Sequence, residues 1–168
     1  MTERTSAEFA SAPERTNRRS QFPMVAHVLL TRRTPGLQIF LQRRAGTGFL
    51  DGFYGLPGGH VKAGELPSEA ARRECREETG VTPLALEPRC VLPYRYQGAV
   101  GVNWVFTATR YDGAPRLAEP ATADVAVWAD AQCLPQRRAR WIDQAVAPEH
   151  WLLERDEDRS IATRRKST

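Results

Sequence analysis

Three glutamates on a helix-like segment, residues 68–79, are the side chains best placed for chemistry. Glu74, Glu77 and Glu78 stand at i, i+3 and i+4, so an ideal helix carries all three on one face. Like charges at this spacing repel each other and destabilise a helix by a few tenths of a kcal/mol per pair. Crowded carboxylates suit a hard divalent cation, above all Mg²⁺, which usually bridges a protein to phosphate groups.

The same glutamates also fit a simpler role, that of an acidic surface stripe without any ligand. Arg73 lies one turn before Glu77 and flanks this face, and together with Arg76 it would neutralise the stripe. Ala71 and Cys75 project to another side of the helix, where we expect them to pack on a sheet. The helix alone does not decide between a metal site and a solvated stripe.

A longer pattern around the helix separates the two interpretations. Its residues keep the order Gly-x5-Glu-x7-Arg-Glu-Cys-x-Glu-Glu-x-Gly-Val, from Gly59 to Val81. In this pattern the chain resembles the Nudix hydrolase family, whose members more often carry Leu, Ile or Val in place of Cys75. The likeness continues upstream through residues 56–59 and 42–45, which resemble MutT-type members. It covers about residues 22–147 and is most specific over residues 42–81.

The resemblance implies an α/β fold, a Nudix-type α/β/α sandwich with a mixed β-sheet. It implies hydrolysis of a nucleoside diphosphate linked to another moiety, with Mg²⁺ as the cofactor and Mn²⁺ as a substitute. The implied metal ligands are the carbonyl of Gly59 and the side chains of Glu74, Glu77 and Glu78. Arg73 would orient these glutamates, and either Glu77 or Glu78 would also act as the base. The substrate contacts carried over from the family are Arg44, Tyr54 and His60.

Outside the pattern each assignment has a structural alternative. Glu119, in a loop, is a candidate general base or extra metal ligand, or else a solvated loop acid. Arg44 fits a contact with a phosphate or base, or a surface ion pair. His60 lies beside the site in sequence, although a packing or hydrogen-bonding role suits it as well. The strand aromatics Tyr94, Tyr96 and Trp104 suit either a nucleobase stack or the core.

Three function classes follow from the resemblance. The leading hypothesis is a MutT-like diphosphatase acting on a free nucleoside triphosphate, either normal or oxidised, with ADP-ribose or a nucleotide sugar as the alternative substrate. A catalytically inactive Nudix module that senses a nucleotide is a second class, and the intact glutamates weigh against it. An isoprenoid-diphosphate isomerase would need a catalytic cysteine, and neither Cys90 nor Cys133 has a recognisable context for one.

The elements that must position these residues alternate between strands and helices. Apolar runs predict a hairpin of strands over residues 24–30 and 36–42, followed by a glycine-rich loop over 45–59. Gly80 stands where a helix C-cap is expected. Further strands are predicted over residues 81–92, 99–110 and 125–128, and a last helix over residues 136–146. This interleaving favours a mixed sheet in an α/β or α+β class.

Size and composition bound the remaining possibilities. The chain has 168 residues, room for one ordinary domain. We expect a disordered arm over residues 1–21, the Nudix domain over 22–150 and a charged tail over 151–168. The net charge of +4 is spread along the chain, so the charge does not call for a stable nucleic-acid partner. The small nucleotide substrate is what the resemblance implies.

The cellular setting is also an expectation from the sequence. No stretch approaches the roughly 18 apolar residues that a membrane helix needs. Three widely spaced cysteines and the lack of an apolar leader favour a cytoplasmic protein. The sequence leaves open whether two copies form a homodimer.

Overall fold

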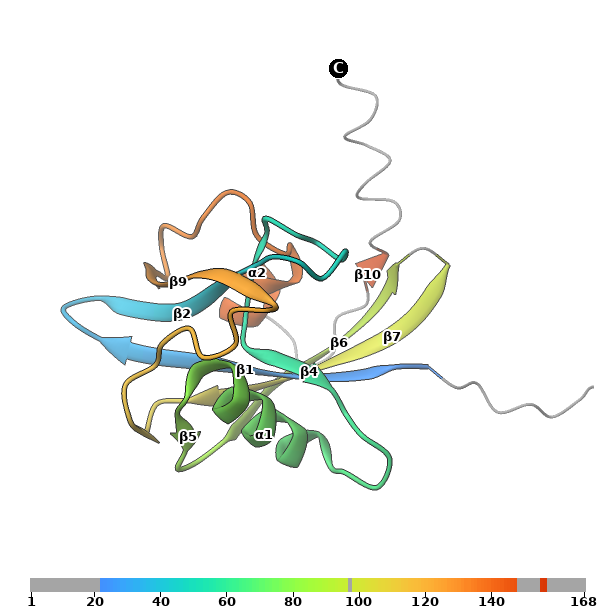
Figure 1. Cartoon of the computed structure of the whole chain (residues 1–168), viewed down its shortest axis with the longest axis horizontal. Coiled ribbons are helices and arrows are strands. Elements are labelled where there is room, and N and C mark those ends of the chain that lie inside the picture. The colour runs from blue at the N-terminus through green and yellow to red at the C-terminus, as the bar shows by residue number, and fades with distance from the viewer. Residues whose placement is uncertain (1–21, 97, 148–154, 157–168) are drawn as a thin grey trace, which may run out of the picture.

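A mixed β-sheet with one helix on each side forms the core of the molecule (Figure 1). The computed structural model describes residues 22–96, 98–147 and 155–156. The predicted arm over residues 1–21 lies outside the described residues, as does most of the predicted tail. Within that tail, β10 (Arg155–Asp156) pairs in parallel with β6 (Glu87–Tyr96).

β1 (Met24–Arg33) is the central strand and joins the parts of the sheet. It runs parallel to β7 (Ala99–Ala108) and antiparallel to β4 (Gly58–His60) along its first half. Its last residues pair with β2 (Leu37–Arg44), which continues to β3 (Tyr54–Gly55) and β9 (Ala123–Asp130). Parallel and antiparallel pairs in one sheet confirm the mixed topology.

The two faces of β1 explain its almost unbroken apolar sequence. Val28 and Leu30 face α1 (Pro67–Thr79), where they pack in a cluster with Ala71 and Cys75. Leu29 faces the opposite side and packs in a second cluster with residues of α2 (Trp141–Val146). In Figure 1, α1 lies below β1 and α2 lies above it. The predicted α/β/α sandwich is therefore confirmed.

Local signals at both ends delimit α1. Leu66 offers no side-chain cap, but the Glu69 carboxylate accepts a hydrogen bond from the Leu66 N–H at 2.8 Å, half of a capping box. At the other end Gly80 has a φ of 74°, and its N–H donates to the Arg76 carbonyl. A left-handed residue at this place favours glycine, as the sequence predicts.

Two predicted elements are shorter or divided in the structure. The strand expected over residues 81–92 is split into β5 (Thr82–Pro83), which pairs with β8 (Tyr111–Asp112), and β6. The helix expected over residues 136–146 begins only at Trp141, because main-chain hydrogen bonds to Tyr54 hold residues 137–139 extended beside β3. Among the described residues, no helix is long and apolar enough to cross a membrane.

Candidate active site

Arg73 is the centre of a partly buried ion-pair network on the acidic face of α1. Its guanidinium contacts three carboxylates: Glu65 at 2.8 Å, Glu74 at 2.5 Å and Glu77 at 3.2 Å. It also donates to the His60 carbonyl at 3.1 Å. The hydrogen bond from Arg73 lowers the pKa of Glu65 to about 2. Arg73 thus holds two of the three helix glutamates in fixed directions and is itself anchored by Glu65.

Gly59 lets the helix approach β4 closely at this point. A Cβ atom on Gly59 would lie 2.6 Å from the Glu74 carboxyl carbon, too close for any real contact. The Glu74 carboxylate therefore lies directly against the Gly59 main chain. A side chain at this position would fill the space that the carboxylate now occupies.

Glu78 lies at the other end of the acidic face and has a different environment. Its carboxylate accepts a hydrogen bond from the Gly58 N–H at 2.9 Å. Burial raises the pKa of Glu78 to about 7, and the neighbouring charges of Glu74 and Glu119 add to the effect. The Gly58 hydrogen bond and the more distant Arg44 act in the opposite direction without cancelling it.

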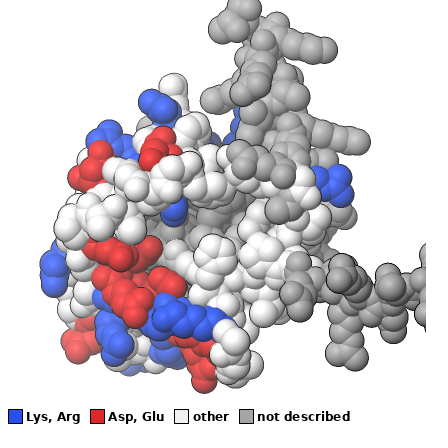
Figure 2. Space-filling model, turned by 45° about the vertical axis from the view of Figure 1, so that its right-hand side comes forward, with Lys and Arg blue, Asp and Glu red and all other residues white. Residues whose placement is uncertain are grey.

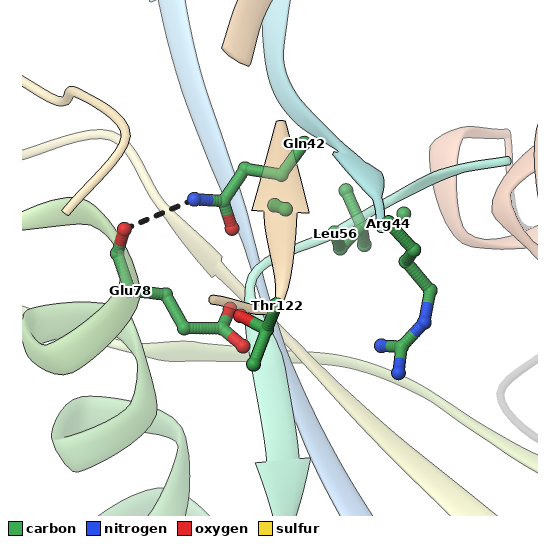
Figure 3. Close-up of a pocket in the computed structure, with 7 residues that line it drawn as sticks. Gln42, Arg44, Leu56, Glu78 and Thr122 are labelled. Carbon is green, nitrogen blue, oxygen red and sulfur yellow. Dashed lines mark hydrogen bonds between the residues drawn. The ribbon is translucent and has the colours of Figure 1, made fainter. Parts of the chain in front are cut away.

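A small pocket opens beside Glu78 (Figure 3). Arg44, at the end of β2, lies on the side of this pocket opposite Glu78. Its Nε donates to the Phe49 carbonyl at 2.9 Å, which helps to fix the orientation of the guanidinium. The full lining is Gln42, Arg44, Gly55, Leu56, Glu78, Thr122 and Ala123.

Glu119 approaches the same pocket from the loop before β9. The Thr122 hydroxyl, which lines the pocket, donates to the Glu119 main-chain carbonyl at 3.3 Å and lies 3.4 Å from its carboxylate. The charge of Glu119 also acts on Glu78. The structure therefore brings Glu119 into the neighbourhood of the helix glutamates.

The side chains of Tyr54 and His60 do not line this pocket. The Tyr54 ring packs against the core cluster on the α2 side, and only its neighbours Gly55 and Leu56 line the pocket. His60 is exposed and contributes its carbonyl to Arg73. Among the strand aromatics, Trp104 packs against the core on the α1 side, whereas the Tyr96 ring contacts Phe49 at 4.8 Å.

Six residues of the site had no assigned role in the sequence analysis: Gln42, Gly55, Leu56, Gly58, Thr122 and Ala123. Gln42 and Thr122 line the pocket, and Gly58 donates to Glu78. Gly58 directly precedes the patterned glycine, so a doubled glycine was the available signal. Gln42 lies 36 residues before Glu78, and no local pattern connects the two.

The charges on this side of the molecule suit a cation. Figure 2 shows acidic side chains gathered at the height of α1, with basic side chains around them and a hollow beside them. Among the described residues, no three acidic, histidine or cysteine side chains already stand as a coordination shell. The donor set nevertheless fits Mg²⁺ or Mn²⁺, because carboxylates of one helix face meet the side-chain-free backbone of Gly59.

Comparisons with known proteins identify the family of the chain. A model of the Nudix domain matches residues 21–150. The 8-oxo-dGTP diphosphatase of Escherichia coli (strain K12) is 32% identical over 78 residues, which are 46% of this chain and 60% of that protein. The match thus spans less than two thirds of that relative.

Solved structures show the same fold. A MutT Nudix hydrolase from Burkholderia pseudomallei superposes with a TM-score of 0.71 and 26% identity, over 78% of this chain and all of that one. The Nudix domain of Shewanella oneidensis NrtR, solved with ADP ribose, gives a TM-score of 0.60 and 23% identity over 76% and 87% of the chains. Since the Nudix model covers most of the sequence, the glutamate helix included, the chain belongs to the Nudix hydrolase family.

Proposed function

We propose that this protein hydrolyses a phosphoanhydride bond of a nucleoside triphosphate, as a MutT-like diphosphatase. Water would attack one phosphorus atom and the bond to the bridging oxygen would break, so that a nucleoside monophosphate and pyrophosphate leave. The observation that carries the proposal is the arrangement around the pocket, where Glu78 faces Arg44 and the other helix glutamates lie next to Gly59.

The carboxylates of Glu74, Glu77 and Glu78, with the Gly59 carbonyl, would hold the divalent metal. When bound, Mg²⁺ would neutralise phosphate charge and lower the pKa of a water molecule. Through its ion pairs, Arg73 would hold the side chains of the ligands Glu74 and Glu77 in their orientations.

The remaining roles belong to residues around the pocket. Arg44 would contact a substrate phosphate with its guanidinium, whose planar fork suits phosphate oxygens. Two carboxylates are candidates for the general base, Glu78 in the pocket wall and Glu119 beside Thr122. Tyr54 and His60 contribute to this scheme through their main chains or neighbours rather than through their side chains.

The substrate within this chemistry is proposed from the relatives. The likeness to the Escherichia coli 8-oxo-dGTP diphosphatase supports an oxidised nucleoside triphosphate. The fold shared with a Nudix domain solved with ADP ribose keeps ADP-ribose as the second candidate. The three free cysteines among the described residues suit the reducing cytoplasm expected from the sequence.

A substrate panel tests the proposal. Purified protein is incubated with normal and 8-oxidised nucleoside triphosphates, ADP-ribose and a nucleotide sugar, in Mg²⁺, Mn²⁺ or EDTA. We expect metal-dependent release of pyrophosphate from one or more triphosphates. Exclusive cleavage of ADP-ribose into two monophosphates would select the second candidate. Tight nucleotide binding without turnover would select the inactive sensing module and refute the proposal.

A further inference from the structure

The main-chain carbonyl of Glu78 accepts hydrogen bonds from two different segments of the chain. Carbonyls in the last turn of a helix lack an intrahelical partner and must find one elsewhere. The Glu78 carbonyl accepts a hydrogen bond from the Gln42 side-chain amide at 3.0 Å and another from the Ala118 N–H at 2.9 Å. The turn of α1 that carries Glu78 is therefore tied both to β2 and to the loop before β9.

Gln42 is a rigid point of attachment. Its side chain is buried, with 6% of the residue exposed, although an amide is costly to bury without hydrogen bonds. Its main chain lies between two neighbouring strands, opposite Gly55 of β3 and Ala126 of β9. The amide that reaches Glu78 thus extends from a strand that is held on both edges.

Gln42 also connects the two sides of the pocket. Gln42 and Arg44 lie two residues apart on β2, and both line the pocket together with Glu78. In Figure 3 the Gln42 nitrogen points at the Glu78 carbonyl, while the Arg44 guanidinium lies on the far side of the pocket. The hydrogen bond therefore sets how far the Glu78 turn stands from the strand that carries Arg44.

We infer that Gln42 is a positioning residue, which holds the Glu78 turn at its working distance from Arg44. This inference rests on the proposed hydrolase function. Without the amide donor, the Glu78 carbonyl keeps only the Ala118 hydrogen bond, so the last turn of α1 loses its side-chain tie to β2 and shifts relative to that strand. The chemical step then slows, because a small misplacement of a reacting group lowers the rate. Substrate affinity through Arg44 stays nearly unchanged.

The test compares two glutamines of the same strand. Gln42→Met keeps the length of the side chain but has no donor. Gln38→Met is the matched control, because Gln38 lies on β2 far from the pocket and only accepts a hydrogen bond from Arg32. We expect Gln42→Met to lower kcat about tenfold with KM within about twofold of wild type, the size of one lost hydrogen bond. Gln38→Met should behave as wild type.

A second variant separates hydrogen bonding from packing. Gln42→Glu keeps the shape of the side chain, but its carboxylate faces the Glu78 carbonyl without a hydrogen to donate. We expect a larger loss of kcat than in Gln42→Met. Equal kcat in Gln42→Met and Gln38→Met would overturn the inference, as would a raised KM with unchanged kcat, which would make Gln42 a substrate contact.

A readout independent of activity keeps this inference distinct from the proposed function. Amide hydrogen exchange at Ala118 and Gly80 should be faster in Gln42→Met than in Gln38→Met, because the last turn of α1 loosens. Unchanged exchange would show that the Gln42 hydrogen bond does not hold the last turn of α1. A wild-type protein without turnover would refute the proposed hydrolase function and the expected effect on kcat. Faster exchange in Gln42→Met would still establish that the Gln42 hydrogen bond holds the last turn of α1. Should Gln42→Met not fold, Gln42→Asn, whose amide is one methylene shorter, takes its place with the same expectations.

Discussion

The glutamates at the two ends of the acidic face of α1 have opposite environments. Glu74 and Glu77 share one arginine, Arg73, which is anchored in turn by Glu65. Glu78, one residue beyond Glu77, has no such partner among the described residues and receives only the Gly58 N–H at its carboxylate. Pairing therefore stabilises the first end, whereas the second end keeps a buried carboxylate with a pKa of about 7.

This difference shows how a cluster of like charges is tolerated before any cation arrives. Arg73 offsets part of the repulsion between the carboxylates. The remaining charge, on Glu78, has a hydrogen bond from the Gly58 N–H, and its burial lowers the stability of the fold. We therefore expect the ion pairs of the paired end to raise the free energy of unfolding. The buried carboxylate of the other end should lower it, although it is needed for function.

The largest expected effect concerns the paired end. Glu77→Gln removes a proposed metal ligand and should lower turnover at least 100-fold in Mg²⁺ while the free energy of unfolding stays within about 0.5 kcal/mol. Steady-state kinetics and urea denaturation measure the two quantities. Arg76→Gln, on the exposed side of the same turn, is the control. A stable Glu77→Gln variant with near-normal rates would refute the ligand assignment.

Arg73→Met breaks the network that distinguishes the paired end. Three carboxylates then lose their shared cation, so we expect the free energy of unfolding to fall by about 2 kcal/mol. Turnover should also drop, roughly tenfold, because Glu74 and Glu77 lose their fixed directions. Arg76→Met is the matched control by denaturation and kinetics. If both variants unfold at the same urea concentration, the network contributes nothing to folding.

Glu78→Gln should have the opposite effect on stability. The raised pKa means that the ionised carboxylate destabilises the folded state at pH 8, and a neutral amide removes that penalty. Even after the loss of the charged acceptor for Gly58, we expect a net gain on the order of 1 kcal/mol in EDTA, together with strongly reduced turnover. Urea denaturation at pH 8 measures the gain. A destabilised Glu78→Gln would contradict the contrast between the two ends.

The pH dependence of stability sharpens the contrast further. Burial lowers the pKa of His27 from 6.5 to about 4, so protons bind the unfolded state first and stability falls as the pH drops from 6.5. Glu78, whose pKa is raised from 4.5 to about 7, binds its proton first in the folded state, and stability rises as the pH drops. The wild type should therefore be nearly level between pH 6.5 and 5.

The two single variants uncouple these opposing effects. In metal-free urea denaturation, the stability of Glu78→Gln should fall by an amount on the order of 1 kcal/mol between pH 6.5 and 5, because only the His27 effect remains. His27→Gln should gain stability over the same range. Parallel pH profiles in the wild type and both variants would show that neither group titrates as described.

Local signals made much of this site predictable. The sequence predicts α1 to within one residue, because the Gly80 cap and the buried positions Ala71 and Cys75 are all encoded within the segment. Apolar runs also locate β1, β2 and β9, although each of these strands extends two or three residues beyond its predicted bounds. The helix pattern also placed Arg73 beside the glutamates that it contacts.

The pocket wall could not be predicted in the same way. Gln42, Glu78 and Thr122 come from a strand, a helix and a loop, and only the folded sheet brings them together. The helix over residues 136–146 was predicted too long for a related reason, since hydrogen bonds to Tyr54 from a distant strand override the local preference of residues 137–139. Contacts between distant segments decide both cases.

The doubled glycine of β4 has a practical consequence for genetics. A methyl group at Gly58 would collide with the main chain of Ala26 and His27, so that replacement should cost the whole fold. At Gly59 the methyl group would instead meet the carboxylate of Glu74, the end of a side chain, which would have to leave its place beside Arg73. We therefore expect Gly59→Ala to give a catalytically inactive allele, whose protein still accumulates normally in the cell.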